Sequence, residues 1–84
     1  MEWEYCDVNG AVNRATNLLD LTIEYRNAPA EVNQQLTHLP RAELEYALQG
    51  LRSEGWQLES QCANPTAEWY IETYTFKRAR QKEE

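Results

Sequence analysis

The sequence predicts an α+β fold in which one helix packs on one face of a single four-stranded antiparallel sheet. Four segments alternate polar and apolar residues with the period of a β-strand, and one segment between them has leucines at helical spacing. The chain has 84 residues, which suits one domain rather than two. We therefore expect one domain over residues 1–78, followed by a charged tail over residues 79–84.

The first half of the chain predicts a pair of strands. Residues 2–8 are rich in strand-forming side chains, and the Asn9-Gly10 pair that follows favours a tight turn. Residues 11–17 are predicted to be a polar connector. Residues 18–26 then alternate most clearly, with one apolar face formed by Leu19, Leu21, Ile23 and Tyr25. This pattern is typical of a strand that has one face in solvent.

The helix is predicted to run from Pro40 to Glu54, after a linker over residues 27–37. Proline is favoured in the first helical turn, where its missing N–H is not needed. Gly55 then suits a left-handed residue that ends the helix. One apolar face of the helix is formed by Leu44, Ala47, Leu48 and Leu51.

Trp56 comes directly after the glycine that ends the helix. We expect this indole to fold back over the leucines and close the core, because a buried Trp contributes a large apolar surface. The alternative is an exposed Trp56 that serves as a platform for a ligand.

The second half predicts another hairpin. Residues 56–62 alternate, with Leu58 and Cys62 on one face, and residues 68–78 form a long strand. A turn at Asn64-Pro65-Thr66 separates the two strands. If the first and last strands are neighbours, the four predicted strands take the order 2-1-4-3, and the helix crosses one face of the sheet.

The charge of the chain is acidic and unevenly distributed. The sequence has 8 basic and 14 acidic residues, a formal net charge of −6. An acidic body repels phosphate backbones, so nucleic acid is not an expected partner. The last eight residues, KRARQKEE, are basic, and we expect them to be a solvated strand end. The alternative is a contact with nucleic acid or an anionic surface. No apolar run is long enough to span a membrane and no signal peptide is evident, so we expect a cytoplasmic protein.

The residues that carry enzyme chemistry are sparse. Cys6 and Cys62 form no CxxC pair, and we expect both thiols to be reduced, buried and inert. His38 is the only histidine, and we expect it to face solvent or cap the helix. Glu43, Glu45 and other carboxylates are expected on solvated faces. The sequence therefore predicts no metal site, no cofactor and no enzymatic activity.

Three motifs together resemble a family of short bacterial and phage proteins catalogued as domain of unknown function 4177. They are the opening Trp3-Glu4-Tyr5, the helix end L-R-S-E-G-W-Q-L over residues 51–58, and the closing Y-T-F-K-R over residues 74–78. The resemblance covers residues 1–8 and about 40–78, whereas residues 9–37 depart from the family pattern. It supports the fold and implies no catalytic residues, because the family has no assigned function.

The distribution of aromatic residues predicts self-association. One helix covers only one face of a sheet, yet the first and last strands have large side chains on both faces. Exposed aromatic surface usually marks an interface. We therefore expect an interaction module that forms a homo-oligomer, with a dimer as the first expectation, through the uncovered face or an edge strand. The expected interface residues are Trp3, Tyr5, Trp69 and Ile71.

The alternative function is binding of a small anionic, nucleotide-like ligand. Aromatic rings stack on bases and arginines bind phosphates. The expected binding residues are Trp69, Tyr70, Arg26 and Arg41. An enzyme that uses His38 with a carboxylate is a third and weaker hypothesis, because no partner residue or pocket is evident from the sequence.

Overall fold

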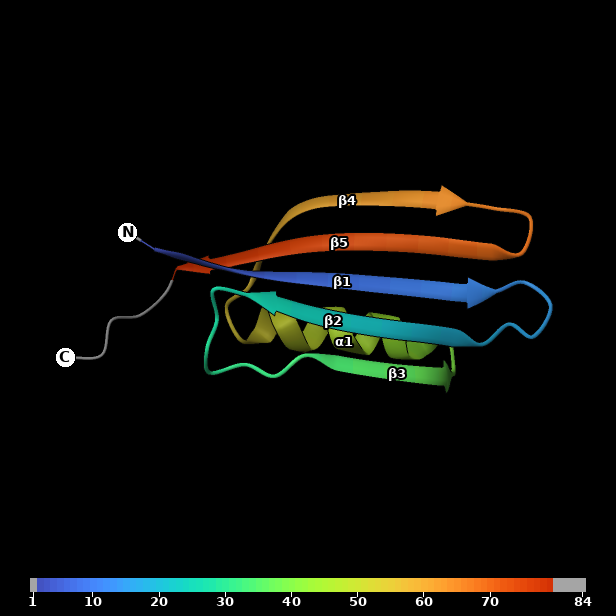
Figure 1. Ribbon diagram of the computed structural model, residues 1–84, viewed down its shortest axis with the longest axis horizontal. Coiled ribbons are helices and arrows are strands. Elements are labelled where there is room, and N and C mark those ends of the chain that lie inside the picture. The colour runs from blue at the N-terminus through green and yellow to red at the C-terminus, as the bar shows by residue number, and fades with distance from the viewer. Residues whose placement is uncertain (1, 80–84) are drawn as a thin grey trace.

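A computed structural model describes residues 2–79 of the chain and shows one helix packed on one face of a five-stranded antiparallel sheet (Figure 1). The strands lie side by side in the order β3-β2-β1-β5-β4. The elements in chain order are β1 (Trp3–Asn13), β2 (Leu19–Arg26), β3 (Gln34–Leu39), α1 (Ala42–Ser53), β4 (Gln57–Pro65) and β5 (Trp69–Ala79). Of the predicted tail over residues 79–84, Ala79 ends β5 and residues 80–84 lie outside the described part.

The predicted α+β class and the antiparallel pairing are confirmed, but the sheet has five strands instead of four. The predicted linker over residues 27–37 contains the start of β3, which extends the sheet beyond β2. The sequence of β3, QQLTHL, does not alternate polar and apolar residues, and five of its six residues are exposed. Backbone pairing with β2 holds this strand, and side-chain periodicity cannot reveal such a strand. The four predicted strands keep their predicted neighbours.

The predicted turn at Asn9-Gly10 is wrong, because β1 continues through both residues to Asn13. Gly10 is buried beneath the helix, and a Cβ atom at this position would lie 3.0 Å from Cδ2 of Leu44. A glycine inside a strand often marks such a close approach of another element. Gly10 therefore lets the helix approach the sheet closely.

The actual turn follows β1 and is built by asparagines. The side-chain Oδ1 of Asn13 accepts hydrogen bonds from the N–H groups of Ala15 (2.8 Å) and Thr16 (3.3 Å). Asn17 takes a left-handed conformation, with φ of 62°, which asparagine tolerates better than most residues. The predicted connector over residues 11–17 is thus shorter than expected.

The two faces of the sheet follow directly from the strand register. Cys6 pairs with Tyr25 of β2 and Phe76 of β5, and all three face the helix. Alternation places the odd-numbered residues of β1 on the opposite side, here called the open face. The apolar face predicted for β2 is confirmed. The buried core consists of Cys6, Val8, Val12, Leu19, Leu21, Ile23, Leu48, Leu51, Trp56 and Phe76.

The end of the helix forms a Schellman motif. Gly55 has φ of 91°, its N–H donates to the carbonyl of Arg52, and the N–H of Trp56 donates to the carbonyl of Leu51, both at 3.1 Å. The motif places Trp56 next to Leu51, which begins the last turn of the helix, and the indole is only 2% exposed. The prediction that Trp56 closes the core is confirmed.

Arg78, near the end of β5, connects four separate segments. Its guanidinium lies over the ring of Trp56, 4.3 Å from the centroid, and donates to the carbonyl of Glu54 at 3.2 Å. It also forms ion pairs of 3.4 Å with Glu4 in β1 and Glu31 in the loop before β3. The carboxylate of Glu4 is largely buried, so this pairing compensates its loss of hydration.

The helix covers only part of its face of the sheet. It lies behind β2 and β3 in Figure 1, whereas no other element lies over β4 and β5. Every residue of β4 is exposed. β4 is consequently bare on both faces, whereas β5 is half-buried along most of its length.

We expect substitution of the two glycines near the helix to have opposite effects. Gly10→Val adds methyl groups against Leu44 and should destabilise the protein by about 1–3 kcal/mol. Gly50→Ala lies on an exposed helix position with open space around it and should stabilise the protein by about 0.5–1 kcal/mol. Urea unfolding of both variants measures the two changes. A neutral Gly10→Val would show that the helix does not press on β1.

Trp56→Ala should destabilise the protein by about 3–5 kcal/mol, because it removes a large buried side chain and leaves a cavity. The matched control is Tyr46→Ala, which truncates an aromatic side chain of α1 that is 65% exposed and should change stability by less than about 0.5 kcal/mol. Denaturant midpoints measure both. Equal effects of the two substitutions would contradict the role of Trp56 in the core.

Candidate functional site

The open face has an aromatic group at each end. At one end, the ring of Trp3 lies 4.7 Å below the Lys77 ammonium, and the ring of Tyr5 lies 5.0 Å below the Arg26 guanidinium. These cation–π contacts cover part of both rings within the monomer, and both residues are only half-exposed. The aromatic surface at this end of the open face is therefore partly covered by cationic side chains of the same chain.

The middle of the open face is polar. Asp7 accepts hydrogen bonds from Arg26 at 2.9 Å and from the hydroxyl of Thr75 at 3.1 Å. The hydroxyl of Thr73 donates to Asn9 at 2.7 Å. Side chains that pair in this way across neighbouring strands stabilise a solvated sheet surface.

The four predicted interface residues share the open face, as the alternation of the strands implies, but they form two groups. Trp3 pairs with Ala79 at one end, and Trp69 pairs with Asn13 at the other, next to Ile71. These positions are ten residue steps apart along β1, a distance of about 33 Å. The polar middle lies between them, so the four residues do not form one continuous apolar patch.

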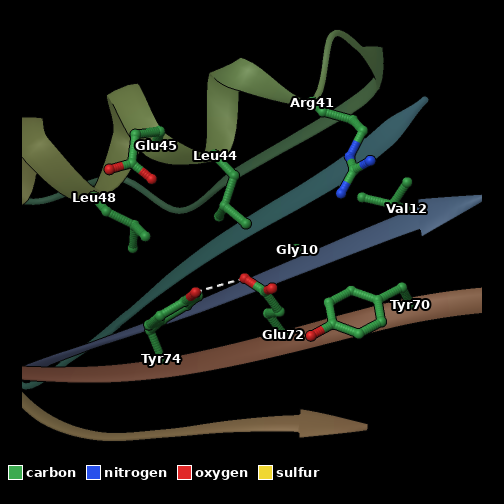
Figure 2. Close-up of a pocket in the computed structure, with 9 residues that line it drawn as sticks. All are labelled: Gly10, Val12, Arg41, Leu44, Glu45, Leu48, Tyr70, Glu72 and Tyr74. Atoms are coloured by element: carbon green, nitrogen blue, oxygen red, sulfur yellow. Dashed lines mark hydrogen bonds between the residues drawn. The ribbon is translucent and has the colours of Figure 1, made fainter. Parts of the chain in front are cut away.

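A pocket of about 140 Å³ lies on the helix side of the sheet, between the start of α1 and β5 (Figure 2). Figure 2 shows side chains of the first turns of α1 on one side and those of β1 and β5 on the other. The pocket is lined by Gly10, Val12, Arg41, Leu44, Glu45, Leu48, Tyr70, Glu72 and Tyr74.

The pocket combines an apolar wall with polar groups. The hydroxyl of Tyr74 donates to Oε2 of Glu72 at 2.5 Å. Burial, and then this bond to a carboxylate, raise the pKa of Tyr74 to about 12, so the phenol stays neutral at physiological pH. Arg41 donates to Oδ1 of Asn17 at 3.4 Å. The pocket thus has a cationic group, two carboxylates and two phenols around an aliphatic wall.

The structure brings together two of the four predicted binding residues. Tyr70 and Arg41 line the pocket, whereas Trp69 and Arg26 lie on the open face. Adjacent residues of a strand point to opposite faces, so residues 69 and 70 cannot line one site. The prediction missed Glu72, although the period-two sequence from residue 70 to 74 places it between two tyrosines on one face.

The strand β4 forms one edge of the sheet. A register shift lies between Leu58 and Ser60, so the even-numbered residues of β4 point to one face of the sheet before the shift and to the other face after it. Leu58 pairs with Phe76 on the helix side, but Cys62 pairs with Thr73, which belongs to the open face. The prediction that Leu58 and Cys62 share a face is wrong for this reason. The prediction that both thiols are buried holds for Cys6 only, because Cys62 is exposed.

The single histidine is part of β3. His38 is exposed, its φ is 58°, and its backbone N–H donates to Oδ1 of Asp20 at 3.2 Å. Among residues 2–79, no three His, Cys, Asp or Glu side chains are placed to hold a metal ion. The same part of the chain contains no helix that is long and apolar enough to cross a membrane.

Comparison with known proteins gives no match, either to a protein-family model or to a curated protein. The resemblance to domain of unknown function 4177 therefore stays a prediction from the quoted motifs.

The two cysteines should differ sharply in reactivity. Cys6 is fully buried, and burial raises the pKa of its thiol to about 12. A thiol-reactive dye such as Ellman's reagent should modify one thiol of the folded protein rapidly and the second only after unfolding, because the thiolate is the reactive form. Cys62→Ser should abolish the fast reaction, whereas Cys6→Ser should leave it unchanged. Rapid labelling of both thiols would contradict the burial of Cys6.

Proposed function

We propose that this protein is a small non-enzymatic interaction module that forms a homodimer through the exposed edge of β4. The observation that carries the proposal is that all nine residues of β4 are exposed in a strand that has a neighbour on one side only. An edge strand of this kind presents unpaired N–H and C=O groups that can pair with another strand.

The free backbone groups of β4 can be identified from the ladder. The N–H of Thr66 donates to the carbonyl of Trp69, so these opposite residues form a hydrogen-bonded pair. Such pairs alternate along an antiparallel ladder. Cys62 and Asn64 therefore bond to β5, and the backbone groups of Gln61 and Ala63 point outward.

The features that usually protect an edge strand from pairing are weak in β4. Natural edges are blocked by lysines, inward-pointing charges, prolines or bulges. The only charged residue of β4 is Glu59, which forms an ion pair of 3.2 Å with Lys77 of the same chain. The register shift lies near the start of the strand, and Pro65 is its last residue. The segment from Ser60 to Asn64 is free of these obstacles.

The other candidate surfaces are less suited to self-association. The edge strand β3 has only six residues, a register shift against β2, and a left-handed residue at His38. The open face has aromatic groups only at its two ends, and its middle is occupied by paired polar side chains. Neither surface offers a continuous row of unpaired groups comparable to β4.

Pairing of β4 with its own copy would follow a two-fold axis, which is the commonest symmetry of homodimers. The axis would pass through the middle of the two antiparallel strands, perpendicular to the sheet. The two five-stranded sheets would then become one ten-stranded sheet. Both helices would lie on the same face of it.

A lysine in the middle of β4 should prevent dimerisation. In Gln61→Lys, the two-fold axis would bring each new ammonium group close to its copy in the partner, where like charges repel. The matched control is Gln35→Lys, which places the same exposed substitution on the edge strand β3. Sedimentation equilibrium should give a dimer for the parent and for Gln35→Lys, and a monomer for Gln61→Lys.

A parent protein that stays monomeric at high micromolar concentration would overturn the proposal. So would a dimer that Gln35→Lys dissociates and Gln61→Lys does not. Circular dichroism of both variants checks that each keeps the fold.

Small-ligand binding is the second candidate function. It is supported by the pocket, which is lined by two of the expected binding residues, Tyr70 and Arg41. The carboxylates of Glu45 and Glu72 in the same pocket oppose the nucleotide-like anion that the sequence predicts, because they would repel a phosphate.

A further inference from the structure

The pocket between α1 and β5 contains charged groups of both signs that do not pair with one another. None of the ion pairs within residues 2–79 involves Arg41, Glu45 or Glu72. The hydrogen bond of Arg41 is to the neutral amide of Asn17, and that of Glu72 is to the neutral phenol of Tyr74. Within the described residues 2–79, all three charges thus lack a charged partner.

The charges are also separated in space. Arg41 and Glu45 are four residues apart in the helical region, a spacing at which opposite charges often pair. Figure 2 shows that Arg41 extends toward Val12, whereas Glu45 lies on the side of Leu48. Glu72 turns toward Tyr74, on the same side as Glu45. The pocket is therefore positive at one end and negative at the other.

We propose that this pocket binds a small zwitterion of the α-amino-acid class. The ligand carboxylate would accept paired hydrogen bonds from the Arg41 guanidinium, whose planar geometry matches a carboxylate. The ligand ammonium would lie between the carboxylates of Glu45 and Glu72. The ligand side chain would contact the apolar wall formed by Val12, Leu44 and Leu48.

Other ligand classes satisfy the pocket less well. A phosphate would meet two carboxylates, and a simple cation would leave Arg41 without a partner. An apolar ligand would remove the three charged groups from water without pairing them, which is costly. The volume of about 140 Å³ lies below the roughly 300–1,000 Å³ of sites for drug-sized ligands, which favours a small ligand over a nucleotide.

The ligand class is tested by thermal unfolding of the full chain with each of the common L-amino acids at millimolar concentration. Binding to the folded state alone raises the melting temperature by mass action, by several degrees in a domain of this size when the ligand exceeds its Kd about tenfold. The N-acetyl derivative and the amide of an amino acid that binds each lack one charge, and neither should raise the melting temperature.

Matched substitutions test whether Arg41 binds the ligand carboxylate and Glu45 the ligand ammonium. Arg41→Gln and Glu45→Gln should each weaken the affinity for that amino acid, measured by calorimetry, at least about tenfold. Arg52→Gln and Glu43→Gln change the same residue types on exposed positions of α1 that do not line the pocket, and both should bind like the parent.

Three results would overturn the inference. The first is that no amino acid raises the melting temperature. The second is that the N-acetyl or amide derivative raises it as much as the free amino acid. The third is that the control substitutions weaken binding as much as Arg41→Gln and Glu45→Gln, which would place the ligand elsewhere.

Discussion

One helix cannot cover a sheet of five strands, and this mismatch in size determines most of the surface. A helix is about 10–12 Å wide with its side chains, and neighbouring strands lie about 4.8 Å apart. A single helix that runs along the strands therefore covers two or three of them. Here α1 packs over β1 and β2, whose helix-side residues are buried, whereas the hairpin of β4 and β5 has no helix over it (Figure 1). The pocket and the exposed edge both arise because this hairpin is left uncovered.

Two glycines determine where the helix lies. Gly10 removes a side chain from β1 at the point where Leu44 packs, so the helix approaches the sheet most closely there. Gly55 ends the helix in a left-handed conformation and directs Trp56 into the core. Arg78 then joins the end of the helix to β1 and β5 through contacts with Glu54 and Glu4. These contacts hold the helix near both of its ends.

The sequence predicts the features that depend on side-chain periodicity or on local backbone chemistry. The alternation in β2, the leucines of α1 and the Gly55-Trp56 helix end were all predicted correctly, and so were the neighbours of four strands. The sequence does not reveal β3, because backbone pairing holds that strand while its side chains stay in solvent. Asn9-Gly10 was misassigned as a turn because the same glycine that suits a turn also suits a close contact with a helix. The pocket depends on how far the helix extends over the sheet, and no local pattern encodes that distance.

The proposed dimer and the proposed ligand site both depend on the hairpin that the helix leaves uncovered, but they use different surfaces of it. In a dimer joined along β4, three strand spacings separate β5 from its copy, which is about 14 Å. Charges at that separation are largely screened at physiological ionic strength, where the Debye length is about 8 Å. The charged side chains of the pocket would also lie behind β5, away from the paired edge. Occupation of one pocket would therefore have little effect on the other or on the affinity of the two chains. A strong coupling between ligand binding and dimerisation would require the hairpin itself to change its twist when the pocket is filled.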